Sequence, residues 1–317
     1  MAVPSNSLQT YQSTNNAEDV TDIVMNVSPV DTPGLTMAKK TVAEATYTQW
    51  PIESLSAVDS ANANIEGDDA TVDASTTPTL VGNYCQLMDK VASVTTTQNA
   101  IRKYGVKNEM AKQMAKKAKE LKRDMETTMF LNQARVVGLA GTAQKMRSMG
   151  SWLTTNTSRG AGGGANGSAT TAATDGTQRN FTEALFKAVV VSCITNADEL
   201  PSVVFAGPAN RANLSSQLSG NSTRFYELMD GTLNASISVY RSDYGPLKLV
   251  MNRFQRERDM WFLNPQYFGV RTLEPMQTVD LARTGLTEKK QLWTNWTLEV
   301  SNEAAHGVLA DLNTAVL

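Results

Sequence analysis

The chain has 317 residues, 41% hydrophobic and 19% charged, so it is long enough to bury the core of one large or two smaller domains. No run of about 18 apolar residues occurs, so no membrane-spanning helix and no membrane partner are expected. The first residues lack the basic and apolar regions of a secretory signal. Cys85 and Cys193 are isolated, which favours two free thiols and leaves a disulfide between them open.

The two signs of charge are separated along the chain. Residues 1–89 hold twelve acidic residues and two lysines, a net charge of −10, whereas residues 90–159 hold fourteen basic and four acidic residues, a net charge of +10. This polarity fits an acidic arm that contacts a basic helix, in the same subunit or in a neighbour. It fits equally two solvated surfaces that never meet, because an exposed charge pair contributes little energy.

Residues 1–38 are predicted to form an N-terminal arm. They are rich in Ser, Thr, Asn and Asp, and the apolar run Ile23-Val24-Met25 is too short for a core. Fully extended, such an arm would reach roughly 125 Å. Residues 39–95 are predicted to form an extended loop, in which Thr41 to Trp50 and Thr71 to Thr79 are β-prone. A hairpin with so little core needs a partner surface to stay ordered.

One long helix is predicted over residues 106–137, within a domain that covers residues 96–154. Its apolar residues recur every three or four positions, at Val106, Met110, Met114, Ala118, Leu121, Met125 and Met129. Thirty-two helical residues would extend about 48 Å, and a shorter helical piece is expected to follow, up to Met149. The spacing does not alternate as a heptad does, so a coiled coil is the weaker interpretation.

A second domain is predicted over residues 155–270, and strands in residues 271–317 are predicted to return and close the first domain. Thr154 to Thr177 is rich in Gly, Ala, Ser and Thr and is predicted to be a flexible loop. A helix from Phe181 to Thr195, a strand from Ser202 to Ala206 and a helix that begins at Pro208 follow. Strands are then predicted at 237–240, 247–251, 260–263, 268–273 and 291–300, which gives an α+β protein with a discontinuous domain.

The candidate catalytic patterns are weak. His306 has no orienting acid beside it and is expected to be a structural histidine. The G-x-G-x-x-G match at 162–167 lies in polar coil without the strand and helix of a dinucleotide site. Four carboxylates around Gly67 fit no EF-hand loop and favour a solvated acidic loop over a metal site: Glu66, Asp68, Asp69 and Asp73. No cofactor is therefore expected.

The basic residues between 102 and 123 could neutralise phosphates without reading sequence, because Tyr104 apart they lack interleaved aromatic residues that stack on bases. They include Lys112, Lys116 and Arg123. A solvated face is the simpler interpretation, and weak, sequence-independent contact with packed nucleic acid is the intermediate one.

Several short patterns, spread over most of the chain, resemble those of the major capsid proteins of tailed bacteriophages, which have the Hong Kong-type fold. They are Asp31-Thr32-Pro33, Trp50 with Glu53 and Leu55, Glu66-Gly67, Asn83 with Gln86, residues 240–245, Leu281 to Gly285 with Arg283, and Leu298 with residues 302–305. The resemblance implies an N-terminal arm, an extended loop, a peripheral domain with a spine helix, and an axial domain. It carries over no catalytic residue.

The resemblance implies a virion shell protein, assembled in the host cytoplasm, that forms pentamers and hexamers around double-stranded DNA. Its partners would be its own copies, packaged DNA through non-specific contact, and decoration, portal or scaffold proteins. The residues expected at assembly interfaces are Asp31, Pro33, Trp50, Glu66, Lys112, Lys116, Arg123, Glu126, Arg283 and Gly285. The alternatives are a shell of cellular origin that packages protein cargo, and a cytosolic enzyme that uses the acidic cluster with a divalent cation.

Overall fold

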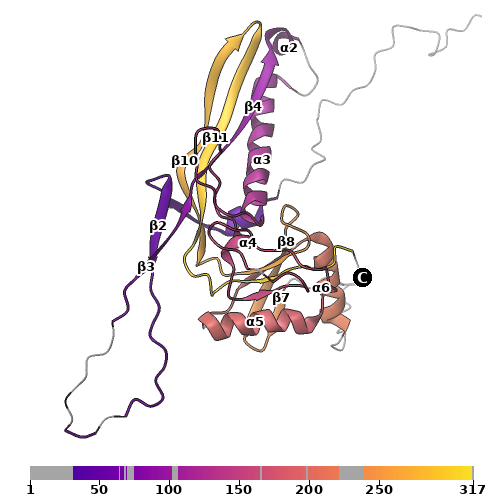
Figure 1. The fold of residues 1–317 in the computed structure, drawn as a ribbon. Helices are drawn as coiled ribbons and strands as arrows, with labels where there is room; N and C mark the ends of the chain where they lie inside the picture. The colour runs from indigo at the N-terminus through magenta and orange to yellow at the C-terminus, as the bar shows by residue number, and fades with distance from the viewer. Residues whose placement is uncertain are drawn as a thin grey trace, which may run out of the picture.

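The computed structural model describes residues 31–63, 65–67, 69, 75–101, 106–164, 166–197, 199–220 and 239–315, with side chains described up to residue 217 in the helix that ends at 220. Figure 1 shows an upright part built of one helix and long strands, a broader body below it, and a hairpin that projects from their junction. The predicted segments Ile23-Val24-Met25 and Arg102-Lys103 lie outside the described residues.

The described helices are short apart from three. They are α1 (Pro33–Met37), α2 (Thr96–Ala100), α3 (Glu109–Met129), α4 (Met149–Trp152), α5 (Glu183–Ala197) and α6 (Pro208–Gly220).

Strands occupy both ends of the chain. They are β1 (Lys39–Val42), β2 (Tyr47–Ile52), β3 (Thr79–Tyr84), β4 (Gln86–Thr95), β5 (Thr157–Ser158), β6 (Val203–Ala206), β7 (Val239–Ser242), β8 (Gly245–Met251), β9 (Met260–Leu263), β10 (Phe268–Thr284), β11 (Thr287–Val300) and β12 (Gly307–Leu309).

The upright part is a four-stranded sheet in the order β1-β10-β11-β4, with α3 packed against β4 and β11. β10 and β11 pair antiparallel from Phe268 opposite Val300 to Thr284 opposite Thr287. The buried residues of α3 include Met110, Leu121 and Met125, which the apolar spacing placed on one face. β4 pairs with β11 along its length, although the sequence analysis assigned it to the extended loop.

The predicted helix over 106–137 is too long: α3 has 21 residues, about 31 Å. The Asn108 side chain accepts a hydrogen bond from the Ala111 N–H and so caps its start. After Phe130 the chain pairs with itself, in isolated bridges that join Val136 to Lys145 and Leu139 to Thr142. The helical piece predicted up to Met149 is therefore wrong, because apolar spacing cannot detect a backbone that folds back on itself.

The lower body is a six-stranded sheet in the order β5-β12-β9-β6-β8-β7, with α5 and α6 beside it (Figure 1). Its core contains Phe186 of α5, whose ring centroid lies 4.9 Å from that of Phe262 in β9. Cys85 and Cys193 are both buried and free, so the disulfide alternative is wrong. β12 returns from the end of the described chain to pair with β9 and β5, so this body also takes in a strand from the segment 271–317, which was predicted to close the other domain.

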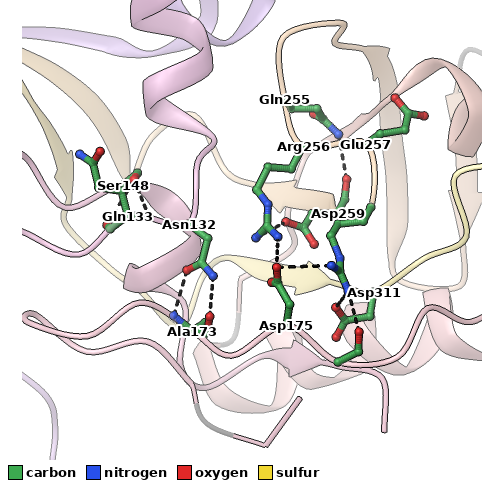
Figure 2. A network of polar contacts seen from close by, with 12 residues as sticks. Asn132, Gln133, Ser148, Ala173, Asp175, Gln255, Arg256, Glu257, Asp259 and Asp311 are labelled. Carbon is green, nitrogen blue, oxygen red and sulfur yellow. Dashed lines mark hydrogen bonds and ion pairs between the residues drawn. The ribbon is translucent and has the colours of Figure 1, made fainter. Parts of the chain in front are cut away.

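The Gly-rich segment 154–177 was predicted to be a flexible loop, and this is wrong for the residues described. The Asn132 side chain exchanges two hydrogen bonds with the Ala173 backbone, as Figure 2 shows. Gly160 donates its N–H to Asp311 Oδ2 at 2.9 Å. A Cβ at Gly160 would collide with the Thr177 carbonyl oxygen, so the glycine permits close packing of two backbones. The low-complexity composition therefore reflects tight packing here.

His306 is fully buried, and its Nδ1 accepts the Asn264 backbone N–H at 3.1 Å, which confirms the structural interpretation. Burial lowers the pKa of His306 from 6.5 to about 4. The unfolded chain therefore binds a proton that the folded chain does not, and stability falls as pH drops from 6.5 towards 4. In the variant His306→Asn, the Oδ1 atom can replace Nδ1 as hydrogen-bond acceptor but does not titrate. We therefore expect its free energy of unfolding to fall by about 3 kcal/mol less than that of the wild type as the pH drops to 4.

Urea unfolding of both proteins between pH 7 and pH 4 measures the difference. An identical pH dependence of the two unfolding free energies would contradict the assignment.

Candidate assembly surfaces

The C-terminal end of α3 holds α1 through one buried carboxylate. Glu126 Oε1 accepts the Gly34 N–H and Glu126 Oε2 the Leu35 N–H, both at 2.8 Å. Asn252 Nδ2 donates a third hydrogen bond to Oε1 at 2.7 Å. Pro33 stands in the first turn of α1, where its missing N–H costs nothing. The structure thus brings Pro33 and Glu126 together. Asp31 precedes α1 and is exposed.

Burial raises the pKa of the Glu126 carboxyl, and the nearby Asp31 charge acts in the same direction, while the backbone and Asn252 hydrogen bonds oppose it. The ionised form of Glu126 is therefore stabilised by its three hydrogen-bond donors. Removing it would leave the first N–H groups of α1 buried without an acceptor.

A basic stripe runs along α3, formed by Lys112, Lys116, Lys119 and Arg123. Spacings of four, three and four residues place these side chains on one face, about opposite the buried Leu121. Among the described carboxylates, none forms an ion pair with the three lysines. The Arg123 guanidinium lies 5.0 Å from the centroid of the Phe254 ring.

Trp50 fixes the base of the β2–β3 hairpin to the body. Its Nε1–H donates to the Val300 carbonyl at 3.0 Å, and its ring lies 5.8 Å from that of Trp152, centroid to centroid. The Arg271 guanidinium lies over the Trp50 ring and also makes a two-bond ion pair with Glu299, at 2.6 and 3.0 Å. The hairpin therefore leaves the end of the four-stranded sheet at a fixed point.

Beyond this base the hairpin exposes apolar side chains. Leu55 is 97% exposed, Val58 98% and Ile65 78%, and the connection between β2 and β3 extends far from the body (Figure 1). Glu66 lies in the same connection and is exposed; Gly67 follows it with a φ of +89°. Apolar residues so far from the core have nothing to pack against in the part of their own subunit that the structure describes.

Arg283 and Gly285 lie at the opposite end, where β10 turns into β11 (Figure 1). Gly285 has a φ of +64°, which the turn requires and which other residues adopt at a cost. The turn contacts α2 through the Leu286 carbonyl, which accepts the Thr96 N–H at 2.9 Å. Arg283 and Leu286 are exposed.

Sequence reasoning missed a partly buried ion network in the lower body, drawn in Figure 2. Asp175 of the Gly-rich segment pairs with Arg256 and, at 3.3 Å, with Arg258. Arg258 also pairs with Asp311 at 2.6 Å. One signal was present in the sequence: Arg159 and Asp175 are the only charged residues in the 24-residue segment 154–177.

Asp259 joins this network through Arg256, at 3.1 Å. Burial raises the pKa of Asp259 from 3.8 to about 6. Because its folded pKa lies above the unfolded value, this group contributes less to stability as pH rises through that interval.

The structure describes two of the four residues of the acidic cluster around Gly67. Glu66 and Asp69 are described, whereas Asp68 and Asp73 lie outside the described residues. Within the part of the chain that the structure describes, no group of three or more His, Cys, Asp or Glu could hold a metal ion. No helix there is long and apolar enough to cross a bilayer.

A helix held at the end of α3, a projecting hairpin, a long helix on a sheet, and an α/β body that shares a hydrophobic core with them together define a capsid subunit of the Hong Kong type. A sequence model of the SU10 major capsid protein family matches residues 5–313, so the chain belongs to that family. The family is structural, so the chain is a virion shell protein and the metal-dependent enzyme alternative is wrong.

Individual proteins agree with this assignment. The major capsid protein of Escherichia phage Phieco32 is 38% identical over 115 residues, which cover 36% of this chain and 32% of that protein. The match thus spans about a third of that relative. The capsid asymmetric unit of cyanophage A-1(L) is similar in structure, with a TM-score of 0.64, 13% identity, and coverage of 96% of this chain and 99% of that one.

A shell protein of another kind has the same fold. The SrpI encapsulin of Synechococcus elongatus PCC 7942 gives a TM-score of 0.55 at 12% identity, over 94% of this chain and 93% of that one. At this identity the likeness shows the fold alone. The fold therefore does not separate a phage head from a cellular compartment, whereas the family does.

We expect Trp50→Ala to lower the free energy of unfolding by about 3–5 kcal/mol, because a large buried ring is removed. Trp50→Phe keeps an aromatic ring and loses the hydrogen bond to Val300, so about 1–2 kcal/mol is expected. Denaturant unfolding of the dilute chain measures both. Equal stability of the wild type and the alanine variant would show that Trp50 does not anchor the hairpin.

Glu126→Ala is expected to cost about 3 kcal/mol, because it leaves buried N–H groups of α1 unpaired, and Glu126→Gln about half as much. Trypsin cleavage after Lys39 and Lys40 should accelerate in the same order, since both lysines directly follow α1. Glu120→Gln is the matched control: Glu120 pairs with Lys117 at 2.7 Å on the partly exposed side of the same helix. Acceleration as large in the control as in Glu126→Ala would refute the role of Glu126.

Proposed function

We propose that this chain assembles into pentamers and hexamers that form the icosahedral head of a phage and enclose double-stranded DNA. The observation that carries the proposal is the β2–β3 hairpin, whose connection exposes Leu55, Val58 and Ile65 far from any core of the same chain. The partner that covers these side chains is a second copy of the chain, because every copy that brings one hairpin to the assembly also brings one surface to receive it. The family assignment supports the same conclusion.

The contact surfaces at the ends of the subunit differ in shape and chemistry. The hairpin is an extended apolar segment, whereas the β10–β11 turn presents Arg283 and a compact glycine turn. Contacts between unlike surfaces are heterologous, and such contacts close into rings when the rotation per copy divides a full turn. Several weak contacts per subunit then act together through their linkage in one chain.

Glu66, Arg283 and Gly285 are exposed or lie in exposed turns, which suits contacts between copies. Trp50, Pro33 and Glu126 instead act inside the subunit, because they attach the segments that reach outward. Decoration, portal and scaffold proteins and packaged DNA are proposed as further partners. The excess of basic over acidic residues in the segment 90–159 as a whole supports the DNA contact.

A cellular compartment that packages protein is the alternative that the fold taken alone leaves open, because an encapsulin is similar in structure. The content of assembled particles separates the two. Nuclease-protected DNA in particles from infected cells supports the phage head, whereas protein cargo without DNA supports the compartment.

Leu55→Ser combined with Val58→Ser tests the hairpin. Both residues are almost fully exposed, so we expect the melting temperature of the dilute chain to stay unchanged, while assembly into rings or shells falls about tenfold or more. Negative-stain microscopy and light scattering at increasing concentration measure assembly. Leu139→Ser is the matched control, because Leu139 is also exposed and lies in the bridged segment after α3.

Normal shells from the double variant would contradict the proposal. A wild-type chain that stays a single copy at every concentration would contradict it as well.

A further inference from the structure

The basic stripe of α3 does not end in solvent at its C-terminal end. Glu126 continues the same row, three residues after Arg123, and there its carboxylate holds the first N–H groups of α1. α1 therefore lies at the end of the face that carries Lys112, Lys116 and Lys119. The chain that precedes Pro33 thus enters the described structure beside this face.

No ion pair joins Lys112, Lys116 or Lys119 to a carboxylate among the described residues, and Glu120, which feels the charge of Lys116, is itself paired with Lys117. Lys117 pairs with Glu120 and Lys90 with Asp124, so the acids on the neighbouring faces of α3 are already used. Lys116 and Lys119 are exposed and Lys112 is partly exposed. Three lysines in line on one helix face repel one another unless an anion lies over them.

The segment that ends at Asp31 has the complementary composition. Residues 1–31 contain four acidic residues, Glu18, Asp19, Asp22 and Asp31, and neither lysine nor arginine. We propose that the basic stripe of α3 is the docking surface for the acidic segment 18–22 of the same chain. The occupant is the chain's own arm, because α1 attaches that arm to the end of the stripe.

Length and tethering support this choice. Fourteen residues separate Lys112 from Glu126, about 21 Å along the helix. Eleven residues separate Asp22 from Pro33, and they reach about 36 Å when extended, so the acids can cover the whole stripe. A short tether raises the effective concentration of the segment to the millimolar range, which favours it over a free polyanion of similar charge density.

Docking of this kind predicts a dependence on salt. Charge pairs at the surface are screened once the Debye length falls below the separation of the charges, from about 10 Å at 0.1 M to 3 Å at 1 M salt. The arm would therefore be held at low ionic strength and released at high ionic strength, while α1 stays attached through Glu126.

Carbodiimide crosslinking of the full, unassembled chain tests the proposal, since the reagent joins a carboxylate to an amine that it touches. We expect crosslinks from Glu18, Asp19 or Asp22 to Lys112, Lys116 or Lys119, reduced about fivefold or more at 1 M salt. The Lys117–Glu120 pair serves as the internal standard for the reaction. In a mixture of unlabelled and ¹⁵N-labelled protein, the two peptides of a crosslink within one chain are either both labelled or both unlabelled. A crosslink between two chains can join a labelled peptide to an unlabelled one.

One variant of the arm and one control variant test whether the acidic residues of the segment 18–22 make the contact. The triple variant Glu18→Gln, Asp19→Asn, Asp22→Asn should abolish the crosslinks and increase the reactivity of the stripe lysines towards an acylating reagent. The control variant Glu44→Gln, Glu53→Gln removes two exposed carboxylates between α1 and the hairpin connection and should change neither.

The proposal is overturned if the crosslinks carry mixed labels, since the arm then comes from another copy. It is overturned too if the internal standard forms without arm crosslinks, or if the stripe lysines become protected only when duplex DNA is added.

Discussion

The structure depends on one constraint: part of the apolar surface of this chain is left uncovered by all the residues that the structure describes. Leu55, Val58 and Ile65 lie on a connection that leaves the body between β2 and β3, and burial of each would contribute about 1.5–3 kcal/mol. A free subunit gains none of this energy. The same residues instead make association with other copies favourable, so a shell gains stability that the free subunit lacks.

Such a design needs firm attachment points, because a loose hairpin or arm would lose more entropy on docking. Both attachments are made at the junction of the upright part and the lower body. Trp50 binds the end of β11 through the Val300 carbonyl, and Glu126 binds α1 at the foot of α3. The long β10–β11 ladder then carries the Arg283 turn to the far end of the subunit, so that contacts of different kinds are kept apart.

Much of the fold could be predicted from the sequence. The strand at 260–263 and the helix that begins at Pro208 were predicted where they occur, because hydrophobic runs and a proline at a first helical turn are local signals. The resemblance to phage capsid proteins, carried by short patterns such as Asp31-Thr32-Pro33, gave the architecture, and the family match confirms it. The boundaries of the domains remain predictions.

What could not be predicted depends on contacts between residues distant in sequence. The helix over 106–137 ends at Met129 because the following segment pairs with itself, and the glycine of its turn, Gly141 with a φ of +88°, lies well beyond the residue at which the helix ends. The Gly-rich segment is held by Asp311 and by Asn132, which lie outside it. Glu126 looked like a helix surface residue, and only α1 makes it a buried acceptor. Composition and spacing describe a segment by itself, whereas its contacts with residues distant in sequence decide whether it is helical, paired or buried.

Hydrogen–deuterium exchange of residues 52–80, compared between the free subunit and the assembled particle, tests the central claim most directly. The account predicts fast exchange in the described part of this connection in the free chain and strong protection after assembly, with little change in β10 and β11, which are paired in both states. Protection already complete in the free subunit would contradict it, and so would exchange that stays fast in the particle.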